Sequence, residues 1–388
     1  MFPAVSSFSL LCLASLLYSS HVKSENVTVD YFLTLINSRQ TSWKAGKHFV
    51  GNFTVKTLTR SNVRIFLRRE SYVPDKPCNL EDVQIPESFD ARTHWPECSD
   101  VIGRVENQGQ CEACWAFAAT SVMSDRLCIK TNGRVKFQFS PQDLVSCCSY
   151  CDSGCTVGVS SKAWHYYANH GIVSGGGFNS FQGCKPYQES EFMQSKKTEC
   201  NKRCDNPSYD VPYADDKHFG SEYYMVNKTP ECIQKEILEN GPVQVTMGLY
   251  EDFAFYKQGV YFYTVGKRRG LHSVKIVGWG VENGIRYWLA ANSWGCQWGN
   301  LNGFFKITRG VDECAIEQHV IAGLPQVPKL PKLDGYVRTT VKSEFSTSKN
   351  FVWPVILGVS ACLVIITLLS IVFHDRIKNL VPKYFRFS

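Results

Sequence analysis

The residues best suited to chemistry in this chain surround a cysteine at the start of an apolar, helix-favouring run. Cys114 follows Gln108-Gly109-Gln110-Cys111-Glu112-Ala113 and precedes Trp115-Ala116-Phe117-Ala118-Ala119. This pattern predicts a thiol at a helix N-terminus, where unpaired amides and the helix dipole favour the thiolate. The thiolate is the nucleophilic form of cysteine, so Cys114 is a candidate nucleophile. Gln108, six residues upstream, can donate its side-chain amide to a developing oxyanion.

Two polar residues far downstream complete a candidate set for nucleophilic catalysis. His272 lies in Leu271-His272-Ser273-Val274, and Asn292 lies in Ala291-Asn292-Ser293-Trp294-Gly295. An imidazole can accept the thiol proton and return it to a leaving group, and an amide can hold the ring in one tautomer. The alternatives are a space-filling histidine, an asparagine in a turn, and a Cys114 that forms half of a disulfide. The chain order of nucleophile, base and orienting residue favours catalysis.

On these motifs the chain resembles papain-like cysteine proteases, and within them the cathepsin B group. The stretch before Trp115 is similar to the family signature C-G-[SA]-C-[WY], with Glu112 in place of its glycine. His272 and Asn292 follow Cys114 by 158 and 178 residues, which exceeds the family's usual spacing of about 130–150 residues. The resemblance extends from about Val27 to Pro325. It implies an α+β, papain-like two-lobed fold, with a helical lobe, a sheet-rich barrel-like lobe and a cleft between them.

The residue pattern of the second half agrees with a sheet-rich lobe. Strand-like alternation occurs at 243–247, 274–278, 287–290 and 303–307. The first half carries the predicted Cys114 helix and most of the cysteines. We therefore expect the nucleophile to come from the helical lobe and the base from the sheet.

The resemblance also implies a role for each site residue. Cys114 would attack a peptide carbonyl, His272 would be its base, and Asn292 would orient the imidazole. Trp294 would shield that hydrogen bond from water, and Gln108 with the amide of Cys114 would stabilise the oxyanion. We expect a cysteine endopeptidase that acts on protein and peptide substrates without a metal or organic cofactor. A catalytically weak, protease-like binding protein is the alternative.

Three departures from the cathepsin B pattern concern specificity. The stretch from Gln188 to Glu199 is short and lacks the adjacent histidines that would hold a substrate's C-terminal carboxylate. Thr156-Val157-Gly158 replaces Asn-Gly-Gly, so Gly158 keeps its backbone bonds to substrate while Val157 narrows the approach. His319 stands where the group has an acidic residue at the floor of its main specificity pocket, and Glu317 is near enough to compensate. We expect weak dipeptide release and poor acceptance of basic side chains in this pocket.

The cysteine content indicates an oxidising compartment, since the chain has 17 cysteines. A zinc site at Cys147, Cys148, Cys151 and Cys155 is an alternative, although adjacent cysteines make poor tetrahedral ligands. Cys78 falls in the expected pro-segment, and Cys232, Cys296 and Cys314 cannot be assigned. By position, the resemblance implies the disulfides Cys98–Cys128, Cys111–Cys155, Cys147–Cys200, Cys148–Cys151 and Cys184–Cys204.

The N-terminal region predicts secretion and zymogen processing. Residues 1–20 hold a short apolar core followed by small residues, as in a cleaved signal peptide. Residues 21–84 are expected to be a pro-segment that inhibits the protease domain at 85–325. Apolar residues at 30–37 have helical spacing, and Trp43-Lys44-Ala45-Gly46 resembles the pro-region of cathepsin B-like zymogens. A small structural subdomain is the alternative. Glycosylation sequons at Asn26, Asn52 and Asn227 agree with secretion.

The C-terminal region predicts a membrane anchor. Residues 351–373 are 23 positions without a charged side chain, and a helix of that length reaches about 34 Å against a hydrocarbon core of about 30 Å. Residues 326–350 would be a flexible stalk and 374–388 a cytoplasmic tail. A buried core helix is the alternative. With the signal peptide, this arrangement predicts a single-pass type I membrane protein with a luminal or extracellular catalytic domain, in the endolysosomal membrane or at the cell surface.

The overall charge does not indicate a nucleic-acid partner. The net charge of +7 is modest, and no basic patch is interleaved with aromatic residues. The expected partners are therefore peptide substrates, the chain's own pro-segment and the membrane.

Overall fold

The computed structural model describes residues 29–47, 73–81, 83–151, 155, 158–178, 180–188 and 199–327. The predicted signal peptide, stalk, membrane helix and cytoplasmic tail lie outside these residues, as do Asn26 and Asn52. In the part that is described, none of the helices combines the length and the apolar character needed to cross a bilayer.

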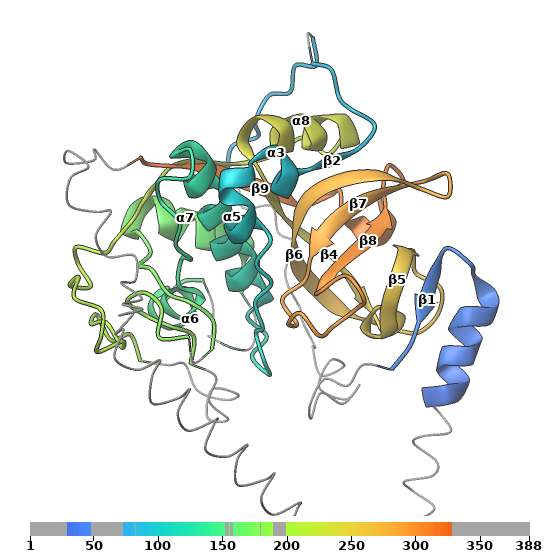
Figure 1. Cartoon of the computed structure of the whole chain (residues 1–388), viewed down its shortest axis with the longest axis horizontal. Coiled ribbons are helices and arrows are strands. Elements are labelled where there is room, and N and C mark those ends of the chain that lie inside the picture. The colour runs from blue at the N-terminus through green and yellow to red at the C-terminus, as the bar shows by residue number, and fades with distance from the viewer. Residues whose placement is uncertain are drawn as a thin grey trace, which may run out of the picture. The chain divides into compact units, whose positions relative to one another are not determined.

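The helical lobe is built around α5, which spans Cys114–Lys130 and is buried over most of its length. Helices α6 (Pro141–Cys147) and α7 (Ser160–His170) lie on the same side of the molecule as α5 (Figure 1). Helix α6 starts where Ser140 accepts a hydrogen bond from the amide of Asp143. Helix α7 ends at Gly171, whose φ of 68° favours glycine. The short elements α3 (Ala91–His94), η1 (Pro96–Cys98) and α4 (Ser99–Ile102) lead toward α5.

A sheet forms the second lobe. Within the described residues it has nine strands in the order β1-β5-β8-β7-β6-β4-β9-β3, with β2 paired to β6. All pairs are antiparallel except β5 with β8. Three buried tryptophans, Trp279, Trp288 and Trp298, belong to its core. The strand bounds are β1 Trp43–Ala45, β2 Phe89–Asp90, β3 Gly220–Met225, β4 Val243–Tyr250, β5 Tyr256–Tyr261, β6 Arg268–Glu282, β7 Ile285–Ala291, β8 Phe304–Thr308 and β9 Val320–Pro325.

The expected division into lobes agrees with these elements. The four predicted strand runs fall on β4, β6, β7 and β8. Helix α8 (Pro230–Asn240) precedes β4, η3 (Asp252–Phe255) precedes β5, and η4 (Glu313–Ala315) precedes β9. The nucleophile candidate thus begins a buried helix, and the base candidate lies on a central strand.

The N-terminal residues 29–47 add to the edge of this sheet. Residues 29–39 are helical, as the apolar spacing at 30–37 predicts, and β1 pairs with β5. Trp43 is 1% exposed and stacks on Tyr256 with ring centroids 6.2 Å apart. Phe32 lies against Phe255. Because these contacts extend the main sheet, residues 29–47 do not form a separate subdomain.

Six disulfides occur among the described residues, and five are the pairs that the resemblance implies. The zinc alternative is wrong, because all four cysteines suggested for it are oxidised. The sixth disulfide joins Cys78 to Cys232, which the sequence left unassigned. Cys114, Cys296 and Cys314 have free thiols.

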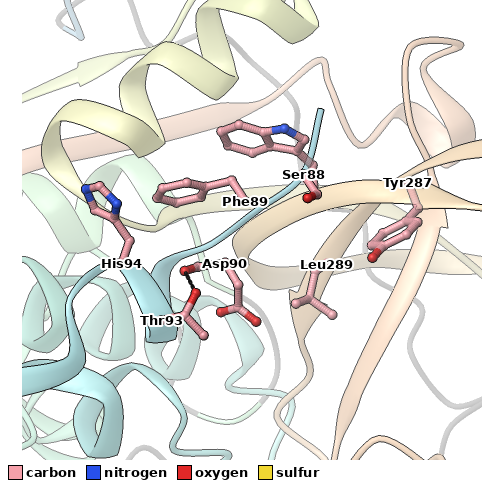
Figure 2. Close-up of a pocket in the computed structure, with 8 residues that line it drawn as sticks. Ser88, Phe89, Asp90, Thr93, His94, Tyr287 and Leu289 are labelled. Carbon is pink, nitrogen blue, oxygen red and sulfur yellow. Dashed lines mark hydrogen bonds between the residues drawn. The ribbon is translucent and has the colours of Figure 1, made fainter. Parts of the chain in front are cut away.

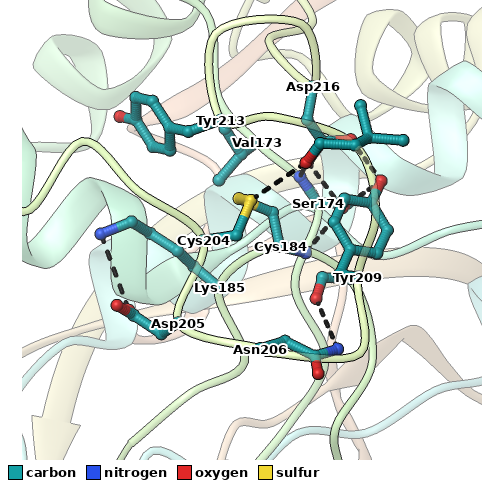
Figure 3. The surroundings of a disulfide bond; sticks show 12 residues. Val173, Ser174, Cys184, Lys185, Cys204, Asp205, Asn206, Tyr209, Tyr213 and Asp216 are labelled. Atoms are coloured by element: carbon teal, nitrogen blue, oxygen red, sulfur yellow. Dashed lines mark hydrogen bonds and ion pairs between the residues drawn. A yellow bond between two sulfur atoms is a disulfide. The ribbon is translucent and has the colours of Figure 1, made fainter.

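The Cys184–Cys204 disulfide lies beside a polar cluster that fixes the chain around it (Figure 3). Asp216 accepts hydrogen bonds from the backbone amide and hydroxyl of Ser174, both at 2.7 Å, and from the Tyr209 hydroxyl at 2.5 Å. The stretch that lacks the carboxylate-binding histidines of the cathepsin B group includes residues 189–198. These residues lie outside the described residues. The disulfide therefore joins the two described segments that flank this stretch.

Candidate active site

Cys114 is the first residue of α5, as the sequence predicts, and is 6% exposed. Its sulfur accepts a hydrogen bond from the backbone amide of Ser273. Because Ser273 follows His272 on β6, this contact brings the thiol of the helical lobe to the strand that carries the candidate base. Cys114 is not part of a disulfide.

His272 and Asn292 are joined by a buried hydrogen bond. The distance from His272 Nε2 to Asn292 Oδ1 is 2.7 Å, and the same oxygen accepts the amide of Ser293 at 2.8 Å. Because Oδ1 is an acceptor, Nε2 carries the proton and Nδ1 is the ring nitrogen that can exchange a proton with a thiol. The Trp294 ring lies 4.8 Å from the imidazole, centroid to centroid, and is 5% exposed. Trp294 therefore lies where the expected shielding role requires it.

Gln108 is fixed by hydrogen bonds from both its side chain and its backbone. Its Nε2 donates to the carbonyl of Cys111 at 2.8 Å, and its Oε1 accepts from the Ser293 hydroxyl at 2.6 Å. Its backbone amide donates to Ser293 O, and the Tyr187 hydroxyl donates to its carbonyl. An amide nitrogen has two hydrogens, so Nε2 keeps a second donor for an oxyanion besides the bond to Cys111.

Gly158 lies against the residue that follows Cys114. A Cβ atom at this position would be 2.1 Å from the Trp115 ring, so any side chain would displace the indole. The position therefore requires glycine for close approach, and not for an unusual φ. Val157, which was expected to narrow this side of the cleft, lies outside the described residues, as does Thr156.

Comparison with known proteins identifies the family. Residues 85–324 match the Papain family cysteine protease profile.

The chain belongs to the papain family of cysteine proteases.

Its relatives also place it in the cathepsin B-like group. It is 40% identical over 326 residues to Cathepsin B-like cysteine proteinase 4 of Caenorhabditis elegans, with 79% of this chain and 93% of that protein covered. It is 39% identical to proteinase 6 of the same organism, with 78% and 84% covered. The solved structure of proCathepsin B S9 from Trypanosoma congolense has a TM-score of 0.67 and 33% identity, and the match covers 77% of this chain and 98% of that one. The protease is thus a cathepsin B-like zymogen.

Burial shifts the pKa of both members of the candidate pair. Burial and the nearby Glu112 carboxylate together raise the pKa of the Cys114 thiol to about 11, and the Ser273 hydrogen bond opposes them in part. Burial also lowers the pKa of His272 to about 4, although its bond to Asn292 opposes this. Burial therefore opposes the thiolate that the helix position favours.

The surroundings of His319 and Glu317 bear on the expected specificity pocket. Burial and the Lys228 ammonium lower the pKa of His319, so the imidazole stays neutral to more acidic pH than an exposed histidine. Glu317 cannot compensate, because its carboxylate already accepts from Trp288 Nε1 at 2.8 Å and from the amides of Gly310 and Asp312 at 2.7 and 2.9 Å. His319 is linked to β4 through its carbonyl, which accepts the Thr246 amide.

Sequence inspection missed a buried ion pair that links the two catalytic elements. Lys275 Nζ on β6 lies 2.7 Å from Asp125 Oδ2 on α5, and their side chains are 2% and 0% exposed. Lys275 also donates to the carbonyl of Ile102. The sequence signal for this ion pair was a lysine within the predicted strand at 274–278, three residues after the candidate base.

A pocket of about 420 Å³ lies elsewhere and does not contain the candidate residues. Phe89 and His94 lie on one side of it, and Tyr287 and Leu289 lie on the other (Figure 2). No candidate catalytic residue lines it, so this pocket is not assigned to the reaction.

Proposed function

We propose that the protease is a cysteine endopeptidase in which Cys114 is the nucleophile and His272 the general base. The buried hydrogen bond from His272 to Asn292, next to a free thiol at the start of α5, carries this proposal. The proton of Cys114 Sγ passes to His272 Nδ1, and sulfur attacks the peptide carbonyl carbon. The imidazolium then protonates the leaving amine, and water hydrolyses the thioester.

Gln108 and the backbone amide of Cys114 stabilise the oxyanion in this proposal. The support is the fixed orientation of the Gln108 amide between Cys111 and Ser293. Asn292 holds the base in the reactive tautomer, and Trp294 keeps water away from their bond. Gly158 and His319 contribute to substrate binding, with bulky apolar side chains preferred over basic ones at the His319 pocket.

The sequence outside the described residues supports the rest of the proposal. The apolar run at 351–373 would anchor the protease as a type I membrane protein of the endolysosomal membrane or cell surface, with the catalytic domain luminal or extracellular. The absence of histidines at 188–199 supports endopeptidase activity over dipeptide release. Within the described residues, Asn227 of the third sequon is exposed, which supports glycosylation there.

Substitution of the nucleophile tests the catalytic assignment. Cys114→Ala should lower peptide hydrolysis by at least about a thousandfold, because no other group replaces the thioester route. Cys296→Ser removes an exposed free thiol and is the matched control, with activity expected to remain. A vinyl sulfone should label the activated wild type and the control but not the Cys114 variant. Full hydrolysis by Cys114→Ala contradicts the assignment, and unlabelled, inactive wild type favours the binding-protein alternative.

A further inference from the structure

The segment at 73–81 covers an edge of the catalytic sheet. Strand β3 ends the strand order, and residue Asp75 forms a parallel bridge with Met225 of β3. The amide of Lys76 donates to the carbonyl of Met225, and the amide of Met225 donates to the carbonyl of Pro74, both at 2.9 Å. This segment precedes the expected mature N-terminus near Ile85, yet it satisfies backbone groups of the catalytic domain.

Its side chains enter the body of the protease as well. Val73 is 5% exposed and belongs to the core of the helical lobe. The Lys76 ammonium lies 2.9 Å from Glu236 Oε2 and 3.0 Å from the Tyr224 hydroxyl. Glu236 is buried and also pairs with Arg126 of α5 at 2.9 Å. Lys76 therefore completes a charge network inside the catalytic domain, and the pKa of Lys76 is raised by these partners despite its partial burial.

A disulfide fixes the same segment covalently. Cys78 is bonded to Cys232 in α8, 154 residues later in the chain. Figure 1 shows the chain before β2 passing beside α8. Farther along, Trp279 Nε1 donates to the carbonyl of Pro86 at 3.0 Å, and Phe89 stacks on Trp279. The described chain is thus attached to the catalytic body at both ends of the stretch from Val73 to Phe89.

We propose that activation cuts the chain on the N-terminal side of Val73 and leaves residues 73–84 as a permanent part of the active enzyme. Release of this segment would expose the β3 edge, the part of the helical-lobe core that Val73 covers, and one face of the Glu236 network. A second cut near Ile85 would not release it, because Cys78 remains bonded to Cys232. Residues 29–47, which carry no cysteine, have no such bond and can dissociate.

Mass measurement of the activated protein tests this proposal. Wild type would be activated at acidic pH, and Cys114→Ala would be cut by added pepsin, so the result does not depend on the catalytic assignment. Under denaturing, non-reducing conditions, every mature species should contain residues 73–84. These residues should be either continuous with the protease domain or, after a second cut near Ile85, held by the disulfide as a peptide that is lost only on reduction. A mature species that starts near Ile85, lacks a linked peptide and has an alkylatable Cys232 would overturn the proposal.

Removing the bond separates its role from that of the docking contacts. In the double variant Cys78→Ser/Cys232→Ser, a 73–84 peptide separated from the domain by a cut near Ile85 should be absent from the mature species under denaturing, non-reducing conditions. Cys296→Ser, the matched control, should retain it. If the double variant does not fold, mild reduction of activated wild type gives the same test through loss of the peptide mass. If the chain is cut near Ile85 and the mass of the 73–84 peptide still stays with the domain after reduction, the assigned disulfide is contradicted.

Discussion

Single side chains around Cys114 decide how readily its thiol ionises. The Ser273 amide favours the thiolate, whereas burial and the Glu112 carboxylate oppose it. Glu112 occupies the position where the papain-family signature has glycine. Reactivity of this protease is therefore expected to depend on a charge that the signature lacks.

Glu112→Gln should make the activated protease react faster with a neutral alkylating reagent at neutral pH. Removal of the carboxylate lowers the pKa of Cys114, and a shift of one pKa unit corresponds to about a tenfold gain in thiolate. Burial raises the pKa of Glu112 itself, so the gain should shrink in mildly acidic buffer as wild-type Glu112 takes up a proton. The iodoacetamide rate across pH measures this, with exposed Glu97→Gln as control. An equal gain at every pH would contradict the electrostatic explanation.

His319→Glu should convert the specificity pocket toward basic side chains. A carboxylate can accept a charge-assisted, bidentate bond from arginine, which a neutral imidazole cannot. The rate of cleavage after Arg-Arg relative to the rate after Phe-Arg should rise by at least about tenfold. This is the gain expected from one strong charge-assisted hydrogen bond. Fluorogenic dipeptides measure the ratio, and His170→Glu at the end of α7 is the control. If wild type already cleaves both equally, the pocket assignment is wrong.

The elements that carry the site are held together by polar contacts across the lobes. Helix α5 and strand β6 meet through the Ser273 amide, and the Lys275–Asp125 pair lies deeper in the same contact. Burial raises the pKa of Asp125 to about 6, with Lys275 opposing the shift. Because this value exceeds the ordinary 3.8, the carboxyl contributes stability below about pH 4 that is lost as the pH rises through about 6.

Lys275→Met should destabilise the protease more at pH 7 than at pH 4.5. At pH 7 the variant has an unpaired buried carboxylate, which costs about 3–5 kcal/mol in the free energy of unfolding. At pH 4.5 Asp125 is protonated and the cost is smaller. Urea unfolding at the two pH values measures this difference. The control is Lys235→Met, whose partly exposed pair with Glu239 on α8 contributes about 0.5 kcal/mol or less. Equal losses at both pH values would refute the paired-charge explanation.

Local sequence predicted the elements better than the contacts between them. The run after Cys114 predicted a helix start because its residues are adjacent in the chain, and α5 begins there. The Cys78–Cys232 bond was not predictable in this way, because it joins residues 154 positions apart and falls outside the pairs that the resemblance implies. The effect of burial on the pKa of Cys114 and of His272 was also not predictable, since desolvation depends on what the folded chain places around them.

For the whole molecule, the proposed membrane anchor would determine where the protease acts. Full-length protein should remain in membranes after carbonate extraction, because residues 351–373 are long enough and apolar enough to span a bilayer. A variant truncated after Pro325 should be secreted in soluble form and cleave the same peptides. Immunoblotting of the two fractions with a luminal epitope checks both statements. Uncleaved full-length chain in the soluble fraction would disprove the anchor.

The pairing of β1 with β5 affects how readily the protease should self-associate after activation. When residues 29–47 leave, β5 becomes the terminal strand and its backbone donors and acceptors on that side lose their partners. Tyr256 and Tyr261, now covered by Trp43, become accessible at the same edge. Unpaired strand edges of this kind promote association between chains. We therefore expect the activated protease, once residues 29–47 have left, to self-associate through this opened edge more readily than the zymogen.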